Sequence, residues 1–300
     1  MIFTIDSSSA GQRVDRFLRK ALPRAPRGEI YKLFRKKDVK RNGKRMDIHE
    51  FLQEGDELFV YLTPDRQRAW GPETMEFHGG DIEIIFEDEV DLVVYKEPGL
   101  KTTPDRRGED SLSLRVQSYL QDACSRTFRP SPLGRLDKDT EGLVLFAKNY
   151  QRSKELEKLQ RNSFIKKLYL ALIFGTIREG LCELRVEKVS QGTGMKESQD
   201  GKLARTIFRI LDQKGDYALV EAELLTGRTH QIRLSLQSLG AELIGDQRYG
   251  RGKGGQRLIC YQLAWQDKQV VHVSEAFKEE IRKVGLDETR ANPSSADPAL

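Results

Sequence analysis

The stretch that decides the fold is Leu133-Gly-Arg-Leu-Asp-Lys-Asp-Thr-Glu-Gly-Leu-Val-Leu-Phe-Ala-Lys148. Its polar first half is followed directly by an apolar run, Leu143 to Ala147, which is typical of a buried strand. A carboxylate at the mouth of such a strand lies beside the apolar interior and still reaches a cleft. Asp137 and Asp139 are the candidates for that position. Taken alone, the stretch is more simply interpreted as a charged turn before a strand, so the decision rests on the remaining sequence.

The overall composition indicates a folded protein that favours polyanionic partners. The chain has 300 residues, enough for one large and one small domain, and a net charge of +5. The positive excess is concentrated between Gly11 and Arg45, where fourteen Lys and Arg residues stand against three Asp and Glu. Cys124, Cys182 and Cys260 are scattered without metal-ligand spacing, which is typical of reduced thiols. The four histidines are dispersed as well, so we expect no metal site. Because there is neither a bilayer-spanning apolar run nor a signal pattern, we expect a soluble, cytoplasmic protein.

Residues 1–62 have the pattern of a small basic module. Apolar residues at helical spacing predict two short helices whose outer faces are basic, and Asn42-Gly43 predicts a tight hairpin turn. Such a surface suits a phosphate backbone, although a merely solvated face would have the same composition. The predicted RNA contacts of this module are Arg35, Lys36, Lys37, Lys40 and Arg41.

The same module resembles the αL-type RNA-binding domain named after a small-subunit ribosomal protein. The residues that carry the resemblance are Gly11 to Leu18, Ile30 to Lys36, Val39 to Arg45 and Glu54 to Asp56. The resemblance covers most of residues 11–62 and implies a small N-terminal α/β fold that binds RNA.

A larger unit follows the basic module. Residues 63–80 are punctuated by proline and glycine and are expected to form a linker, and residues 81–284 are expected to form the larger domain. Residues 285–300 are rich in Ser, Pro and Asp and are expected to be a disordered tail. Within the larger domain we expect mainly strands, a loop over residues 190–202, and helices over residues 112–120, 149–161 and 276–284.

The segment Thr226-Gly-Arg-Thr-His-Gln-Ile-Arg-Leu-Ser-Leu-Gln-Ser-Leu-Gly240 predicts a turn, a helix and a glycine stop. Thr226 or Thr229 is expected to cap the helix. His230 and Arg233 share one face near its N-terminus, which is a natural site for an anion. A surface helix with a few polar residues is the alternative.

The chemical inventory of the chain is an aspartate, arginines and a tyrosine on a predicted strand. It includes no dinucleotide fingerprint, no phosphate-binding loop and no nucleophile elbow. An aspartate acts as a nucleophile or a general base without a cofactor. Asp137-Lys-Asp-Thr140 is also similar to the signature of haloacid-dehalogenase-type phosphatases. There, however, the aspartates follow an apolar strand, whereas here the apolar run comes after them, so we set that interpretation aside.

Four segments, in order, resemble the motifs of the pseudouridine synthases, in particular those of the RluA-like branch. They are Val94-Tyr-Lys-Glu-Pro-Gly-Leu100, Arg135-Leu-Asp137 with Thr140 and Gly142, Lys167-Leu-Tyr-Leu-Ala171 with Gly175, and Thr226 to Arg233 with Gly245-Asp-Gln-Arg-Tyr-Gly250. One such motif is a weak signal, whereas four in order are a strong one. The resemblance spans residues 91–250 and implies an α+β fold with a largely antiparallel central sheet.

The resemblance also implies catalytic roles for three residues. Asp137 would begin cleavage of the uridine N-glycosidic bond, after which the uracil is turned and rejoined through carbon. Tyr169 would lie against the base and assist proton removal from the isomerised ring. Arg233 would pair with Asp137 and orient it. Asp139 is left with a role in stabilising the turn.

Four further residues are expected to contact the substrate RNA: Arg135, Ile232, Arg228 and His230. Arg135 would occupy the space that a flipped-out uridine leaves in the RNA stack, and Ile232 would form part of the pocket wall. The implied chemistry needs no cofactor and no metal. The expected partner of this chain, which we expect to be monomeric, is large-subunit ribosomal RNA. Transfer RNA is an alternative substrate, and a catalytically inactive RNA-binding or ribosome-assembly factor is an alternative of another class.

Several positions depart from the RluA-like pattern. Gly134 stands where histidine is usual and Glu141 where serine is usual, which makes the catalytic motif closer to that of the RsuA-like branch. Ser235 and Glu97 are also unusual. None of the four replaces Asp137, so the departures bear on the choice of substrate and not on the chemistry.

Overall fold

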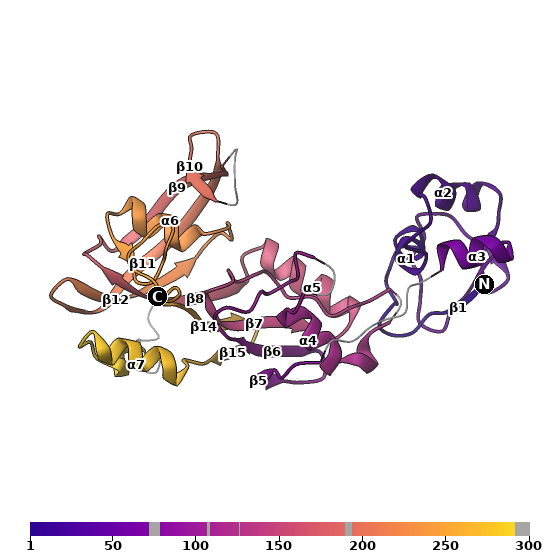
Figure 1. The fold of residues 1–300 in the computed structure, drawn as a ribbon. Helices are drawn as coiled ribbons and strands as arrows, with labels where there is room; N and C mark the ends of the chain where they lie inside the picture. The colour runs from indigo at the N-terminus through magenta and orange to yellow at the C-terminus, as the bar shows by residue number, and fades with distance from the viewer. Residues whose placement is uncertain (72–78, 107–108, 126, 190–193, 292–300) are drawn as a thin grey trace.

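The computed structural model describes residues 1–71, 79–106, 109–125, 127–189 and 194–291, which form two separate β-sheets with helices packed on them (Figure 1). The N-terminal sheet has four strands in the order β1-β4-β2-β3. Its elements are β1 (Ile2–Thr4), α1 (Val14–Ala21), α2 (Arg27–Arg35), β2 (Val39–Arg41), β3 (Lys44–Arg45), β4 (Glu57–Val60) and α3 (Pro64–Trp70).

The N-terminal sheet and its helices enclose a hydrophobic core of their own. Helix α1 buries Val14, Phe17 and Leu18 at helical spacing, and these side chains pack against the inward-facing residues of the strands. Asn42 and Gly43 both have positive φ angles, 50° and 75°, as the two central residues of the β2–β3 hairpin turn. The predicted hairpin is therefore confirmed, because this turn type needs positive φ at both positions.

Two expectations about the ends of the larger unit were wrong. Residues 64–70 of the expected linker form helix α3, which Thr63 caps by accepting a hydrogen bond from the Arg66 backbone N–H at 3.4 Å. Trp70 then packs against the N-terminal core. Residues 285–291 of the expected disordered tail are ordered, since Leu286 and Ala291 are buried and residues Glu288–Ala291 form the 3₁₀ helix η2. Residues 72–78 and 292–300 lie outside the described part of the chain.

The second sheet has eleven strands in the order β10-β9-β11-β12-β8-β14-β7-β6-β5, with β13 beside β8 and β15 beside β14. All its pairings are antiparallel except that of β7 with β14, which confirms the predicted largely antiparallel α+β fold. The strands are β5 (Glu83–Glu87), β6 (Asp91–Lys96), β7 (Glu141–Ala147), β8 (Ile165–Phe174), β9 (Gly180–Lys188), β10 (Met195–Glu197), β11 (Lys202–Lys214), β12 (Tyr217–Leu224), β13 (Glu242–Leu243), β14 (Leu258–Trp265) and β15 (Lys268–Val271).

Helices cover both faces of this sheet. Alternate residues of β8 point to opposite faces, so that Tyr169 and Leu170 belong to different hydrophobic clusters. The cluster that contains Tyr169 packs against α5 (Tyr150–Arg161) and α6 (Gln231–Ser238), and the helices on the other face are α4 (Leu112–Tyr119), followed by the 3₁₀ helix η1 (Gln121–Ala123), and α7 (Glu275–Lys283). Figure 1 shows α6 and α7 on opposite sides of the sheet.

The parallel pairing of β7 with β14 joins the two halves of the large sheet. The register there pairs Gly142 with Cys260. A Cβ atom on Gly142 would lie 2.3 to 2.8 Å from the backbone of Cys260, and Gly142 has a φ of +117°. Only glycine allows this close approach. All seven residues of β7 are buried, as the apolar run from residue 143 to residue 147 predicted.

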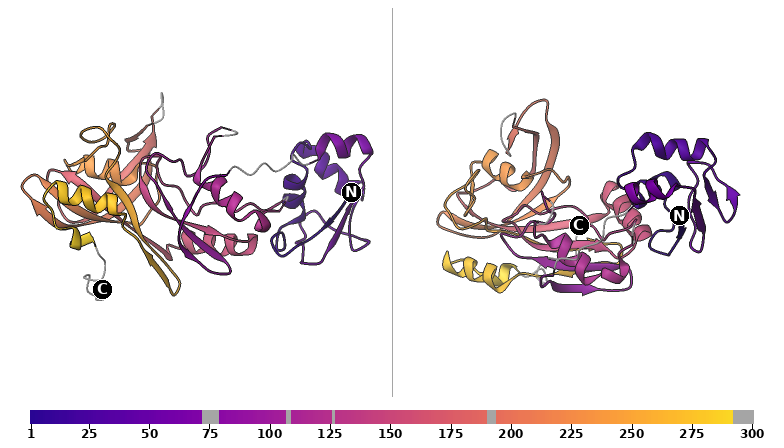
Figure 2. Two further views of the ribbon diagram at one scale, coloured as in Figure 1. Left: turned by 60° about the horizontal axis from the view of Figure 1, so that its bottom comes forward. Right: turned by 45° about the vertical axis from the view of Figure 1, so that its right-hand side comes forward.

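The N-terminal unit also contacts the larger one. The Ser9 hydroxyl lies 2.8 Å from that of Thr127, and the Lys20 ammonium donates to the Thr127 carbonyl oxygen at 2.8 Å. The same ammonium lies 5.0 Å from the ring centre of Tyr150 on α5. The two views in Figure 2 show the N-terminal unit beside the end of the larger unit where α5 lies.

Candidate active site

Asp137 lies in the loop that leads into β7, and its backbone is fixed on both sides. The Thr102 hydroxyl donates to the Leu136 carbonyl at 2.8 Å and accepts from the Leu136 N–H at 3.1 Å. The Lys96 ammonium, fully buried, donates to the Lys138 carbonyl at 2.9 Å. These bonds hold the residues on either side of Asp137 and so set the direction of its carboxylate.

The ammonium of Lys96 has two further carbonyl partners, those of Glu97 at 2.9 Å and Leu100 at 2.7 Å. Burial lowers the pKa of Lys96 to about 8, with the neighbouring carboxylates of Asp139 and Asp137 acting in the opposite direction. Lys96 therefore remains charged at neutral pH. Asp139 contributes to this charge balance, and the turn on which it lies is closed by Lys96.

Arg233 is held between two carboxylates at the start of α6. Its Nη1 donates to Asp137 Oδ2 at 2.9 Å, while Nε and Nη2 donate to the two oxygens of Asp246 at 2.6 and 2.8 Å. Asp246 is fully buried and the side chain of Arg233 is 7% exposed. Burial acts to lower the pKa of Arg233, but the hydrogen bonds to Asp246 and Asp137 raise it above its ordinary value. The guanidinium is therefore a fixed cation.

Gln256 fills the space between Arg233 and Thr140. With the carbonyl oxygen of its side chain turned toward Arg233, that oxygen accepts from Nη1 at 3.1 Å, and the amide nitrogen donates to the Thr140 hydroxyl at 3.0 Å. This orientation satisfies both ends of the buried amide. The loop of Asp137 and the guanidinium that pairs with it are thus connected a second time, through Thr140.

His230 lies on the same side of Asp137 as Arg233. Its Nε2 is 3.8 Å from Asp137 Oδ2, and its Nδ1 is 2.9 Å from the hydroxyl of Tyr249. Burial lowers the pKa of His230 despite the nearby Asp137 carboxylate, so the imidazole is neutral at neutral pH. Arg233 and His230 thus both approach Oδ2 of Asp137.

The start of α6 differs from the prediction. Neither Thr226 nor Thr229 caps the helix; His230 occupies the N-cap position in the left-handed conformation, with a φ of 56° and without a side-chain cap. The Thr226 hydroxyl instead donates to the Gln231 side chain at 2.8 Å. Strained backbone of this kind concentrates at functional sites. The predicted anion near this helix start is supplied by the chain itself, since Arg233 binds two carboxylates.

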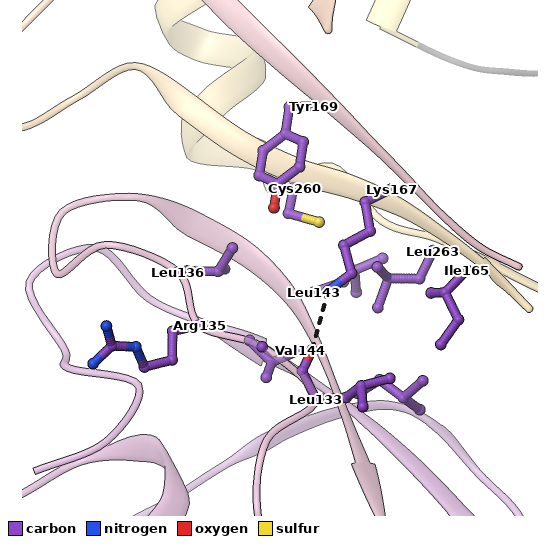
Figure 3. A pocket seen from close by; sticks show the side chains of 12 residues that line it. Leu133, Arg135, Leu136, Leu143, Val144, Ile165, Lys167, Tyr169, Cys260 and Leu263 are labelled. Carbon is purple, nitrogen blue, oxygen red and sulfur yellow. Dashed lines mark hydrogen bonds between the residues drawn. The ribbon is translucent and has the colours of Figure 1, made fainter. Parts of the chain in front are cut away.

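Tyr169 on β8 faces Cys260 on β14, its partner in the strand register. Figure 3 shows its hydroxyl beside the sulfur of Cys260, with Lys167 on the same face. Burial, the Cys260 thiol and the Asp137 carboxylate raise the pKa of Tyr169 well above 10, so its hydroxyl is protonated at neutral pH. Tyr169 lies on the Asp137 side of the sheet and presents a neutral hydroxyl there.

Gly134 has a local structural explanation. The Lys167 ammonium donates to the Leu133 carbonyl at 3.0 Å, and a Cβ atom on Gly134 would lie 3.0 Å from that ammonium. Gly134 also has a φ of +92°. A side chain there would clash with the Lys167 ammonium and strain the backbone. Glycine at position 134 therefore leaves room for the bond from Lys167 to the Leu133 carbonyl.

Glu141 also has a structural explanation. It is buried at the start of β7, where its carboxylate accepts hydrogen bonds from the Tyr95 hydroxyl and, at 2.8 Å, from the Ser274 hydroxyl. Ser274 in turn caps α7 by accepting from the Phe277 N–H at 3.1 Å. Glu141 therefore anchors α7 to the central strands and does not face Asp137's partners.

The remaining predicted contacts of the larger unit differ in exposure. Arg135 is exposed and points away from Tyr169 in Figure 3. Ile232 is buried in the same cluster as Tyr169. Arg228 is exposed, and its Nε donates to the Leu203 carbonyl at 3.0 Å, which fixes it on β11.

The predicted contacts of the N-terminal unit also differ. Arg35, Lys36 and Lys37 are exposed at the end of α2. Lys40 lies over the ring of Tyr61, 5.2 Å from its centre. Arg41 is already engaged, with Nη2 donating to Glu50 at 2.8 Å and Nη1 to a backbone carbonyl at 3.0 Å.

Four residues of the site were assigned no role in the sequence: Asp246, Gln256, Tyr249 and Lys96. Asp246 and Tyr249 stand in the motif segment Gly245-Asp-Gln-Arg-Tyr-Gly250. The motif marks this segment as part of the site, but it does not indicate which side chains the two residues contact. Over the described residues, no group of three or more His, Cys, Asp and Glu side chains is arranged to hold a metal ion, and no helix has the length and apolar character needed to cross a bilayer.

Known proteins with the same pattern identify the family. Residues 90–238 match the model of the RNA pseudouridylate synthases. The ribosomal large subunit pseudouridine synthase C of Rickettsia bellii is 33% identical over 269 residues, which cover 84% of this chain and 87% of that protein. The protein of the same name from Escherichia coli is 32% identical over 262 residues, 83% of this chain and 79% of the relative.

Solved structures share the fold. Human RNA pseudouridylate synthase domain containing 4 superposes with a TM-score of 0.57 at 19% identity, over 68% of this chain and 94% of that one. Human RNA pseudouridylate synthase domain containing 1 gives 0.53 at 21% identity, over 68% and 86%. On the sequence matches and on the pairing of Asp137 with Arg233, the chain belongs to the RNA pseudouridylate synthase family.

Proposed function

We propose that this protein converts uridine to pseudouridine in large-subunit ribosomal RNA. Membership of the family makes it an isomerase that acts on uridine in RNA, and both relatives reported above are named for the large ribosomal subunit. The observation that carries the proposal is the ion pair between Asp137, whose side chain is 25% exposed, and the buried Arg233, on the face of the sheet that also presents Tyr169.

The reaction is an isomerisation, so its atoms balance within the substrate. The bond between N1 of uracil and C1′ of ribose breaks, and a bond between C5 and C1′ forms. The proton on C5 leaves and N1 ends with a proton. No electrons are gained or lost overall, so side chains that attack, hold and move a proton are sufficient.

In this proposal Asp137 starts the reaction through Oδ1, because Oδ2 is occupied by Arg233 and faced by His230. A carboxylate placed beside the glycosidic bond acts as nucleophile or base. Arg233, held by Asp246, positions the carboxylate and balances its charge. Tyr169 packs against the base, and its hydroxyl can relay the C5 proton: it takes the proton from C5 as its own proton passes to the carboxylate of Asp137, while N1 takes a proton from water.

The target uridine has to leave the RNA stack to reach Asp137. Flipping a base costs a few kcal/mol of unstacking. Arg135 is exposed and points away from the sheet interior, so its planar guanidinium is available to fill the vacated place. Ile232 supplies an apolar wall, and Arg228 and His230 contact the RNA close to the helix start.

We further propose that the N-terminal unit binds RNA. Arg35, Lys36 and Lys37 form an exposed basic end of α2 that suits a phosphate backbone. Lys40 contributes from strand β2, apart from α2, and Arg41 contributes less because it is already paired with Glu50. We place the end of the N-terminal domain at Trp70 rather than at residue 62, because α3 packs against its core. The protein acts as a monomer, since all the proposed catalytic side chains come from one chain.

The test is to map pseudouridine in ribosomal RNA and transfer RNA from cells that carry the wild type, Asp137→Ala or Asp139→Ala. We expect specific sites of large-subunit ribosomal RNA to lose pseudouridine with Asp137→Ala and to keep it with Asp139→Ala. If pseudouridine were lost only at transfer RNA sites, the substrate would be transfer RNA and not ribosomal RNA. Equal levels in all three strains would refute catalysis and favour an RNA-binding assembly factor.

A further inference from the structure

Helices cover one face of the N-terminal sheet, and among the residues that the structure describes no helix lies on its other face. Phe3, Val39, Leu58 and Val60 point toward α1 and α2 and belong to the core. Because side chains alternate along a strand, the residues between them point to the other face. Figure 2 shows the helices of this unit on one side of its strands.

The strand register places a continuous row of side chains across the uncovered face. Ile2 of β1 is opposite Phe59 of β4, Phe59 is opposite Lys40 of β2, and Lys40 is opposite Arg45 of β3. Directly opposed residues share a face of the sheet. Tyr61, two residues beyond Phe59, lies on the same face and under the Lys40 ammonium.

This outer face exposes apolar and aromatic side chains to solvent. Ile2 is 57% and Tyr61 is 56% exposed, while Phe59 is half-buried between them. A single exposed apolar side chain is common on a protein surface, whereas a group of neighbouring ones often marks an interaction site. Glu57 is the acidic residue of the face, and it lies at the end away from Tyr61, opposite Thr4.

The chemistry of the face fits one kind of occupant. Aromatic side chains on a four-stranded sheet stack against unpaired bases, and cations beside them contact the phosphates of the same strand. Lys40 and Arg45 provide those cations next to the two aromatic rings. The bases of an RNA duplex are stacked inside the helix, so a duplex would gain the phosphate contacts of this surface but not the stacking on the aromatic rings.

We infer that the outer face of the N-terminal sheet binds unpaired nucleotides of the RNA, with Tyr61 as a stacking platform and Lys40 and Arg45 as phosphate contacts. The inference rests on the proposed function, since it assumes an RNA partner. It gives the N-terminal unit two separate contacts: the basic end of α2, which follows a phosphate backbone, and the sheet face, which takes bases that lie outside a helix.

The test compares full-length wild type, Tyr61→Ala and Tyr61→Phe in binding to two probes: a 12-nucleotide single strand of adenosine and cytidine, and a duplex of the same length. The duplex is built with inosine opposite cytidine and ribothymidine opposite adenosine, so that neither probe contains a uridine with a proton on C5 for the active site to convert. We expect Tyr61→Ala to bind the single strand about tenfold more weakly, equivalent to ~1.4 kcal/mol, and the duplex within twofold.

Two comparisons make the result decisive. Tyr61→Phe keeps the ring and should bind like the wild type, and Tyr31→Ala removes a tyrosine of α2 that is 52% exposed and lies off the sheet, so it should change little. Unchanged binding by Tyr61→Ala, equal loss for both probes, or equal loss with Tyr61→Phe would overturn the inference. Pseudouridine formation by the same wild-type preparation tests the proposed function separately.

Discussion

Replacing Asp246 by Asn should cost both stability and activity, because Asp246 holds the arginine that positions Asp137. Its two oxygens accept from Arg233 at 2.6 and 2.8 Å, and Oδ1 also accepts from the backbone N–H of Arg248 at 2.9 Å. Asparagine of the same shape keeps one oxygen, so its amide would face the Arg233 Nε as donor against donor. One charge-assisted hydrogen bond is lost, about 1.5–3 kcal/mol, and the upper limit for breaking a buried ion pair is about 3–5 kcal/mol.

We therefore expect the free energy of unfolding to fall by ~2–4 kcal/mol, measured by urea denaturation. We expect kcat to fall about 30-fold, equivalent to ~2 kcal/mol of lost transition-state stabilisation, because Arg233 no longer holds Oδ2 of Asp137 in place. KM should stay within about threefold, since Asp246 is fully buried and so lies out of reach of a bound RNA. Single-turnover release of tritium from 5-tritiated uridine in the RNA measures the chemical step.

The matched control is Asp91→Asn. Asp91 is also fully buried and accepts from Arg152 at 2.7 Å through both oxygens, but this pair lies between β6 and α5 and not beside Asp137. It should lose stability to a similar extent while keeping the kcat of the folded enzyme. If Asp246→Asn retained wild-type kcat, or if both variants lost kcat equally, the positioning role of Asp246 would be refuted.

Three further predictions concern the backbone around the site. Gly142→Ala should prevent stable folding, with a cost above ~4 kcal/mol, because the new Cβ would lie 2.3 Å from the Cys260 carbonyl oxygen; soluble yield and thermal unfolding measure it, and a stable soluble protein would contradict it. Lys96→Met should abolish the rise in stability that this lysine adds between pH 8 and 10. The folded-state pKa of about 8 lies below the ordinary 10.5, so the unfolded chain binds more protons in that window and stability grows with pH; identical pH dependence in urea unfolding of wild type and variant would exclude this. Gly134→Ala should lower stability by ~1–3 kcal/mol through its φ of +92° and the contact with Lys167, and an unchanged unfolding midpoint would argue against both.

Pattern in the sequence was sufficient for the strands and for the central turn. The apolar run from Leu143 to Ala147 predicted a strand that is buried along its length, and Asn42-Gly43 predicted its hairpin, because these signals are local. Helix α3 was missed although Thr63 followed by Pro64 is a helix start signal. The prolines and glycines of residues 63–80 favour a linker instead. The packing of Trp70 shows that residues 64–70 belong to the N-terminal core.

The sequence pattern does not predict most of the side-chain contacts that complete the site. The pairing of Asp137 with Arg233 was expected from the family resemblance, and the structure brings the two together. The second carboxylate on Arg233 was not expected, because nothing local to Asp246 reveals that its side chain is fully buried. In the sequence Glu141 stands out as a departure from the catalytic motif, but its partner Ser274 lies 133 positions away in the chain, so the sequence does not reveal why it is there.

The parallel seam between β7 and β14 has a consequence for how the enzyme is made. Asp137 and Arg233 are 96 positions apart, and the Thr140–Gln256 contact beside the seam spans 116. Contacts between such distant segments form late, because a long loop has to close first. A growing chain on the ribosome therefore completes its basic N-terminal unit early but has no assembled reaction centre until β14 has been synthesised. With an N-terminal unit that binds RNA as proposed above, the growing chain would associate with RNA throughout that interval and would not yet alter it.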